Sequence, residues 1–415
     1  MVKRRVDLLV LNSNETVTLD RPDSENELGV VDNGGVAISQ GNIVLAASTQ
    51  LLQRRFRARR TIDVRDEIIL PGFVDPHTHL VFDGAREQEF QHRIAGAKYM
   101  DVLRSGGGII ETVNRTRQAS PERLFQSGKR RLDTCLESGS TTVEIKSGYG
   151  LRRDSELKIL SVVNRLKKDH PCNIVPTYMG AHAVPPGEVS SEYVTSMTNE
   201  TMPQVAKAGL AEFCDVFCEQ GAFDSIASGK ILRKAVSLGL KVKLHADQFT
   251  DCGGAALANK FHATSADHLV RSPRTQLERM TETNVTPVLL PSSSHSLLGA
   301  QYADARGMLA MGLPVALGTD FSPSNWMLGQ LTTAAVASRE LRMNASEIIR
   351  GITINAARAL GLENEVGSLD AGKQADLVTL RAPNHKWIGY TYGERIVDNV
   401  LIGGEWVVRD GRRIL

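Results

Sequence analysis

The feature that most constrains this chain is a regular alternation of strand-like and helix-like segments through its middle. Eight short apolar runs alternate with helical segments along residues 72–320. The runs read GFVDPHTHL, TTVEIKSG, NIVPTYMGAH, FCDVFCEQ, KVKLHADQ, ATSADHL, VTPVLLP and PVALGTD. Eight β/α units close most economically into a parallel barrel. We therefore predict an α/β fold whose main part is a distorted TIM (β/α)8 barrel.

The helical segments carry start and stop signals that support a barrel. Ser120, Pro121 and Glu122 offer an N-cap, a proline at the first helical position and an early acid, and Gly139 ends the same segment. A second segment, residues 155–168, is amphipathic. Its apolar face consists of Leu157, Leu160, Val163 and Leu166.

Both ends of the chain have a different pattern. Residues 4–70 alternate short β-type runs with Gly, Asn and Asp turns, which predicts a small antiparallel sheet. Near the C-terminus, ADLVTLRA and VDNVLIGGEWVVRDGRRIL repeat this pattern, with hairpin turns at Gly403-Gly404 and Asp410-Gly411. We expect residues 1–66 and 372–415 to build one small β-sandwich domain beside a barrel of residues 67–371.

Charge and cysteine content argue against several classes of protein. The 415 residues carry a net charge of +2, so we expect no nucleic-acid partner, and the arginine-rich RRFRARR at 54–60 is predicted to be a solvated edge or loop. Five cysteines without a C-x-x-C pair fit a reducing compartment. The N-terminal apolar stretch is broken by Asp7, and no run is long enough to span a membrane. We expect a cytoplasmic protein.

Polar residues with metal-binding chemistry follow most of the predicted strands. A barrel carries its active site at the carboxyl ends of its strands, so these residues should converge. They are His77 and His79 in the first unit, His182 in the third, Glu219 in the fourth, His245 in the fifth, His268 in the sixth and Asp320 in the eighth. One such histidine alone is most often structural. Together, three histidines and a carboxylate suit Zn²⁺ or Fe²⁺ with a position left for water.

Longer phrases extend this pattern to a known family. The chain resembles the amidohydrolase superfamily in PGFVDPHTHL, in His245 and His268, in LGTD and in INAARALGL followed by GSLDAGKQADLV. Within that superfamily it resembles the imidazolonepropionases from end to end. The more specific phrases are HTHLVFDGAREQEF, SGGGIIETVNRTR, EIKSGYGL, GAHAVPP, DVFCEQGAF, LHADQF and SADHL.

The resemblance implies an activity, a cofactor and an assembly. It implies hydrolysis of the cyclic amide C–N bond of 4-imidazolone-5-propanoate to N-formimino-L-glutamate, the third step of histidine degradation. It implies one divalent metal ion per chain, Zn²⁺ or Fe²⁺/Fe³⁺, bound by His77, His79, His245 and Asp320. His268 and Asp320 would handle protons as catalytic residues. The family expectation for assembly is a homodimer.

The resemblance also implies a set of substrate-binding residues. Arg86 is suited to grip the propionate carboxylate with its bidentate fork. The other expected contacts are Tyr149, His182, Tyr99, Gln248, Ser322, Ser324 and Asn325. Two positions depart from the family pattern. Gln248 stands where family members can carry Glu, and FSPSNWM replaces an Asn-Pro-Gly phrase after Asp320.

These departures keep other functions open. A hydrolase acting on another cyclic amide or amidine would share the barrel and the metal ligands. A two-metal site, with Glu219 bridging and His268 binding the second ion, would also use residues of this set. A scaffold that has lost its chemistry is a third alternative, although none of the four expected metal ligands is missing.

Overall fold

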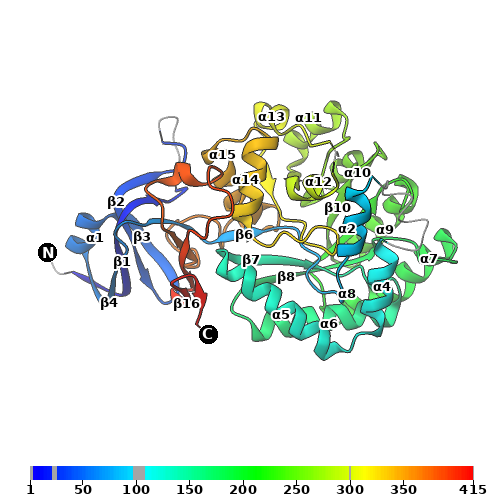
Figure 1. Ribbon diagram of the computed structural model, residues 1–415, viewed down its shortest axis with the longest axis horizontal. Coiled ribbons are helices and arrows are strands. Elements are labelled where there is room, and N and C mark those ends of the chain that lie inside the picture. The colour runs from blue at the N-terminus through cyan, green and yellow to red at the C-terminus, as the bar shows by residue number, and fades with distance from the viewer. Residues whose placement is uncertain (1–2, 21–25, 97–107, 299–300, 415) are drawn as a thin grey trace.

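The computed structural model describes residues 3–20, 26–96, 108–298 and 301–414. A barrel forms one part of the molecule, and a sheet made from both ends of the chain lies at one side of it, with both termini at that side (Figure 1). The separation into a barrel and a terminal sheet agrees with the predicted fold class. The domain boundaries at 66/67 and 371/372 stay a prediction.

The barrel contains the eight predicted strands, and all neighbouring pairs are parallel. In chain order they are β6 (Phe73–Asp75), β7 (Ser140–Lys146), β8 (Asn173–Ala181), β9 (Phe213–Cys218), β10 (Lys241–Ala246), β11 (Ser265–His268), β12 (Thr286–Leu289) and β13 (Ala316–Leu317). An isolated parallel bridge between Thr78 and Phe321 joins the first and last units just beyond the strands. The ring is therefore nearly closed, as predicted.

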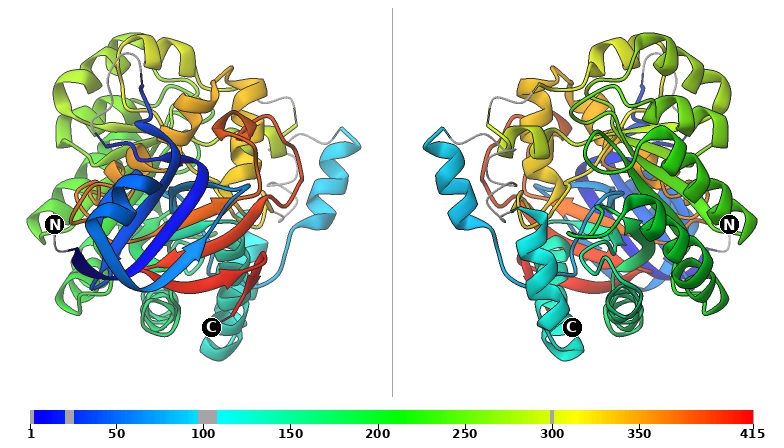
Figure 2. Two further views of the ribbon diagram at one scale, coloured as in Figure 1. Left: turned by 90° about the vertical axis from the view of Figure 1, so that its left-hand side faces the viewer. Right: turned by 90° about the vertical axis from the view of Figure 1, so that its right-hand side faces the viewer.

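Helices surround the barrel on its outside (Figure 2). They are α2 (Glu87–Ile94), α4 (Ile109–Gln118), α5 (Pro121–Glu137), α6 (Arg153–Asp169), α7 (Ser190–Ser196), the π-helical turn η1 (Met197–Thr201), α8 (Met202–Lys207), α9 (Ser225–Ser237), α10 (Gly254–Phe261), α11 (Arg274–Thr283), α12 (Pro291–Ser296), α13 (Ala305–Ala310), α14 (Gln330–Glu340), α15 (Ala345–Gly351) and α16 (Ile354–Arg358). The expected cap of α5 is confirmed, because the Ser120 side chain accepts a hydrogen bond from the Arg123 amide. None of the helices within the described ranges combines the length and apolar character needed to cross a membrane.

The terminal sheet has nine strands in the order β17-β16-β15-β14-β5-β1-β2-β3, with β4 paired to β1. They are β1 (Arg4–Val17), β2 (Val30–Ser39), β3 (Asn42–Ser48), β4 (Phe56–Asp63), β5 (Ile68–Pro71), β14 (Leu377–Leu380), β15 (Val397–Ile402), β16 (Glu405–Arg409) and β17 (Arg412–Arg413). The helix α1 (Thr49–Arg55) and a 3₁₀ turn, η2 (His385–Trp387), accompany the sheet.

One expectation about this sheet is wrong in part. The segment 4–70 is not purely antiparallel, because β1 pairs in parallel with both β4 and β5. A parallel pair needs a crossover, and the chain from β1 to β4 provides one through β2, β3 and α1. The strand direction depends on this long connection, whereas the alternating pattern of each strand is local.

The predicted hairpin turns and the solvated arginine run agree with the structure. Gly403 and Gly404 have φ of 56° and 77°, and Asp410 and Gly411 have φ of 50° and 70°, the left-handed pair that a tight hairpin turn requires. The run at 54–60 ends α1 and begins β4, and all five of its arginines are at least partly exposed. It is a solvated edge of the sheet.

Candidate active site

Atoms of the four predicted metal ligands converge just beyond the carboxyl ends of the barrel strands. His77 and His79 follow β6, His245 lies in β10 and Asp320 follows β13. The Nε2 atoms of His79 and His245 are 3.2 Å apart. Asp320 Oδ1 lies 3.5 Å from His77 Nε2 and 3.6 Å from His79 Nε2. Ligands at the corners of a tetrahedron with bonds of about 2.0–2.1 Å are about 3.3 Å apart, so the spacing fits one ion.

The chemistry of these residues also fits a divalent metal. His77 Nε2 is buried without a hydrogen-bond partner, while its Nδ1 lies 2.6 Å from Asp267 Oδ2. His245 Nδ1 lies 3.0 Å from Asp215 Oδ2. Burial lowers the pKa of His77 and of His79 well below the ordinary value, which keeps both imidazoles in the neutral form that binds metal. The carboxylates thus turn a free Nε2 of His77 and of His245 towards the common centre.

Asp320 combines burial with an unusual backbone. Burial raises the pKa of its carboxyl to about 6, and a hydrogen bond from Ser293 acts in the opposite direction. Its φ is 50°, in the left-handed region that residues with a side chain rarely adopt. Its amide donates to the carbonyl of His77 at 3.0 Å, which ties together the segments of two predicted metal ligands.

His268 lies beside the same centre. Its ring centroid is 5.6 Å from that of His77 and 5.2 Å from that of His245, and the residue is 4% exposed. Its φ is 77°, again in the left-handed region, and such strain is found where a side chain must be held in one direction. Burial lowers the pKa of His268 well below its ordinary value. A neutral imidazole here can accept a proton or donate a hydrogen bond.

Two predicted ring-binding residues surround His79. His182 stacks on it with ring centroids 4.8 Å apart, and the Tyr149 ring lies 5.8 Å from it. Burial, reinforced by His245, lowers the pKa of His182 to about 3. Its Nδ1 lies 3.1 Å from the Gly148 carbonyl, as expected for a donor, which leaves the other nitrogen as an acceptor.

Arg86 is buried at the start of α2, where Glu89 Oε2 lies 3.5 Å from its Nη1. Arg86 Nε is buried without a hydrogen-bond partner. Arg93, about two turns further along, donates to the carbonyl of Ser296 at the end of α12 at 2.9 Å and to the carbonyl of Ser324 after β13 at 3.3 Å. A buried guanidinium with unused donor capacity suits a carboxylate ligand.

The loop after Asp320 is largely held by its own contacts. The Asn325 amide donates to the carbonyls of Thr319 and Asp320 at 2.8 and 3.1 Å, and its oxygen accepts from Ser296 at 2.7 Å. The hydroxyls of Ser322 and Ser324 are 3.2 Å apart. The structure thus gives Asn325 a role in holding this loop.

The remaining predicted site residues are Gln248, Tyr99 and Glu219. Gln248 is half-buried, two residues beyond β10, and Tyr99 lies outside the residues that the structure describes. Glu219 accepts hydrogen bonds from the Gln220 and Phe249 amides at 2.9 and 2.8 Å and from Thr250. Its carboxylate organises a loop and is not part of a metal-capable group among the described residues.

A charged network beneath the ligands was not foreseen from the sequence. Its members are Glu144, Lys146, Asp215, Lys243 and Asp267, all fully buried inside the barrel. Burial alone would lower the pKa of the Lys146 ammonium, but the neighbouring carboxylates raise it above its ordinary value. Pairs two residues apart in a barrel strand, such as Glu-x-Lys in β7 and Lys-x-His in β10, were the available signal.

Comparison with known proteins adds the family. The model of the Amidohydrolase family matches residues 188–407. An imidazolonepropionase of Shouchella clausii (strain KSM-K16) is 44% identical over 393 residues, which cover 93% of this chain and 88% of that protein. One of Alkaliphilus metalliredigens (strain QYMF) is 39% identical over 99% of this chain and 100% of its own length.

A solved structure gives the same fold. An adenosine deaminase of Xanthomonas campestris with bound zinc has a TM-score of 0.78 over 100% of this chain and 95% of its own. At 20% sequence identity this likeness concerns the fold alone. The Amidohydrolase match and the converging ligand atoms together support a divalent metal in this chain.

Proposed function

The chain belongs to the imidazolonepropionase family of amidohydrolases, and we propose that it hydrolyses the cyclic amide of 4-imidazolone-5-propanoate to N-formimino-L-glutamate. This is the third step of histidine degradation. The observation that carries the proposal is the convergence of His77, His79, His245 and Asp320, together with a buried Arg86 whose charge helps to lower the pKa of His182. A metal site next to a carboxylate-binding guanidinium matches a substrate that is both a cyclic amide and an acid.

We propose one metal ion per chain, Zn²⁺ or Fe²⁺/Fe³⁺, held by His77, His79, His245 and Asp320. A divalent ion at this place supplies Lewis acidity and makes a water a better nucleophile near neutral pH. The hydrogen bonds from Nδ1 of His77 and His245 to carboxylates support Nε2 as the ligand atom of both.

His268 and Asp320 are the proposed catalytic residues. Hydrolysis breaks the ring C–N bond: the carbonyl carbon gains the water oxygen, and the leaving nitrogen gains a proton. Asp320 can accept the proton that the water loses, and His268 can orient the water or stabilise the negative charge that develops on the carbonyl oxygen. Their burial and shared centre support a direct role for both.

The substrate contacts are proposed around the same group of residues. Arg86 binds the propionate carboxylate, and Tyr149 and His182 orient the ring beside His79. Gln248 can hydrogen-bond the substrate but cannot transfer a proton. Ser322, Ser324, Asn325 and Tyr99 complete the proposed set.

Assembly, location and domain division remain proposals of the same kind. We propose a cytoplasmic homodimer whose partner is a small molecule rather than nucleic acid or a membrane. Residues 1–66 and 372–415 form the proposed β-sandwich domain, and residues 67–371 the barrel. Size measurement in solution and limited proteolysis test these points.

Another cyclic amide or amidine is the second candidate substrate. The loop after Asp320 supports this second candidate, because the Asn325 amide already forms hydrogen bonds within the protein. The hydroxyl side chains of Ser322 and Ser324 have a different reach towards a substrate than a free amide side chain has. Profiling a panel of cyclic ureides and amidines beside imidazolonepropionate distinguishes the two.

The decisive experiment follows substrate loss and formiminoglutamate formation together. Protein of measured metal content is mixed with freshly generated imidazolonepropionate, with His77→Ala as the metal-site control and exposed Ile226→Ala as the matched surface control. Product formation that is lost in His77→Ala but retained in Ile226→Ala supports the proposal. Absence of product from metal-loaded wild-type protein overturns the substrate assignment.

A further inference from the structure

We propose that Lys146 is a positioning residue for the metal site. Its ammonium stands at a second group of residues with metal-like spacing, and through Asp215 it fixes which nitrogen His245 presents to the metal. The inference rests on the proposed function only in taking His245 as a metal ligand. Within the described part of the chain, the Lys146 side chain pairs with carboxylates and not with a proposed metal ligand.

The first observation is the geometry around the ammonium. Lys146 Nζ lies 2.7 Å from Glu144 Oε2 and 2.7 Å from Asp215 Oδ2, and 3.7 Å from Asp267 Oδ2. All four side chains are 0% exposed. Three carboxylates around one ammonium form the kind of anionic cage that a metal ion would otherwise fill.

The second observation is that this cage has metal-like spacing. Among the residues that the structure describes, His77, Glu144 and Asp267 form a second group whose ligand atoms lie within 4.8 Å of one another. Lys146 and Lys243 both approach Glu144 Oε2, at 2.7 and 3.4 Å. Positive charge already stands at this group, so a second ion would have to compete with two ammonium groups.

The third observation connects the cage to the metal ligands. Asp215 Oδ2 is shared between Lys146 at 2.7 Å and His245 Nδ1 at 3.0 Å, while Asp215 Oδ1 accepts from the His245 amide at 3.1 Å. Asp267 Oδ2 similarly faces His77 Nδ1 at 2.6 Å. An anionic acceptor at Nδ1 holds the proton there and keeps Nε2 free for metal.

Lys243 provides a matched control. It is equally buried in the neighbouring part of the barrel, but its closest contact is with the Pro76 carbonyl at 2.9 Å. It stands 3.4 Å from Glu144 Oε2 and 4.0 Å from Asp267 Oδ2, and among the described residues it forms no ion pair with Asp215. Lys243→Met removes a buried ammonium as Lys146→Met does, yet leaves the contact to Asp215 intact.

The test measures metal binding without turnover. Metal-free full-length wild type, K146M and K243M are titrated with Zn²⁺ in the presence of a competing chelator, and with Co²⁺ to record its visible spectrum. We expect about one tight ion in wild type, roughly 10- to 100-fold weaker binding with a changed Co²⁺ spectrum in K146M, and affinity within about threefold of wild type in K243M.

Other outcomes overturn the inference. Equal losses of metal affinity in K146M and K243M would indicate a general effect of removing a buried charge. Two tightly bound ions in wild type would mean that Lys146 does not exclude a second ion. If K146M does not fold, D215N is tested in its place. Metal affinity equal to that of wild type in D215N would contradict the proposed action of Lys146 through Asp215 on His245. The substrate proposal can fail separately. If K146M binds metal more weakly than wild type but wild type has no activity on imidazolonepropionate, the proposed substrate is refuted and the inference about Lys146 stands.

Discussion

The barrel and the terminal sheet bury their interiors equally well but fill them differently. The barrel interior below the ligands holds five fully buried charged side chains, from Glu144 to Asp267. The sheet core is apolar, with Leu8, Val10, Leu377 and Leu401 all at 0–1% exposure. We infer from this difference that the barrel interior serves function, whereas the sheet core serves stability alone.

Burying charge has a cost that the apolar regions must offset. Each ion loses its hydration, and pairing returns that free energy only where the geometry is good. Apolar burial contributes roughly 25 cal/mol per Å² with no such loss. We therefore expect substitutions in the barrel interior and around its ligands to change chemistry, and substitutions in the sheet core to change stability alone.

The largest expected effect is that of His268→Asn. Removal of a group that acts on protons in the transition state should lower kcat by about 10²- to 10⁴-fold. Metal content should stay near that of wild type and the melting temperature should change little, because His268 is not a proposed ligand. Metal analysis beside steady-state kinetics checks this. Loss of the ion in the variant would make His268 a ligand instead.

The converse test lies in the sheet. Leu377, in β14, is fully buried, and Leu377→Ala should lower the free energy of unfolding by about 2–5 kcal/mol. The kcat/KM of the protein that remains folded should equal that of wild type. Denaturant titration and kinetics on the same samples measure both. A drop in kcat/KM without a loss of stability would break the contrast between the two regions.

Arg86→Lys compares a buried, proposed substrate contact with an exposed arginine of the same barrel. Lysine keeps the charge but loses the planar fork, so kcat/KM should fall about 10- to 100-fold, mainly through KM. Arg115→Lys is the matched control, because its pair with Glu111 on α4 is exposed and should leave the kinetics unchanged. An unchanged KM in Arg86→Lys would remove Arg86 from the carboxylate site.

Much of this contrast could be predicted from the sequence, because its signals are local. The strands of the barrel follow from apolar runs between capped helices, and the proposed ligands were chosen as polar residues at the strand ends. His77, His245 and Asp320 do converge as expected. The hairpin turns depend on residues such as Gly403 and Gly404 that favour positive φ wherever they stand.

The rest depends on contacts between distant segments. Glu144 and Lys146 alternate with apolar residues, a pattern that by itself also describes a solvated strand face; only closure of the barrel turns that face inwards. The parallel pairing of β1 with β4 likewise depends on the path of the intervening chain. The hydrogen bond of Ser293, in α12, to Asp320 likewise joins two segments that are apart in the sequence.

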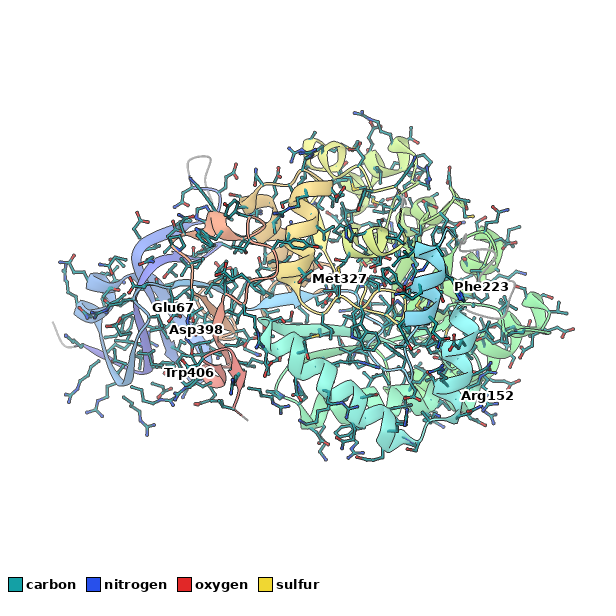
Figure 3. All side chains as sticks on the ribbon, in the orientation of Figure 1. Glu67, Arg152, Phe223, Met327, Asp398 and Trp406 are labelled. Carbon is teal, nitrogen blue, oxygen red and sulfur yellow. The ribbon has the colours of Figure 1, made fainter. Side chains whose placement is uncertain are left out.

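The smallest expected effect concerns a pair of carboxyl groups in the sheet region. Glu67 lies close to Asp398, on the sheet side of the molecule (Figure 3). Burial, reinforced by Asp398, raises the pKa of Glu67 from 4.5 to about 7. The folded state therefore binds this proton more tightly than the unfolded state, so the stabilisation is complete below about pH 4.5 and is lost as the pH rises through about 7.

Glu67→Gln removes this dependence, because glutamine does not ionise. The variant and wild type should unfold with similar free energy at pH 4.5, and the variant should be more stable by about 1 kcal/mol at pH 8, a value reduced for the partial exposure of the side chain. Exposed Glu405→Gln, in the same sheet, is the control and should leave the pH dependence of stability as in wild type. Urea titrations at both pH values measure the difference, and parallel curves for Glu67→Gln and wild type would refute it. An accompanying change in kcat/KM would mean that the sheet also tunes the barrel site, which its apolar core gives no reason to expect.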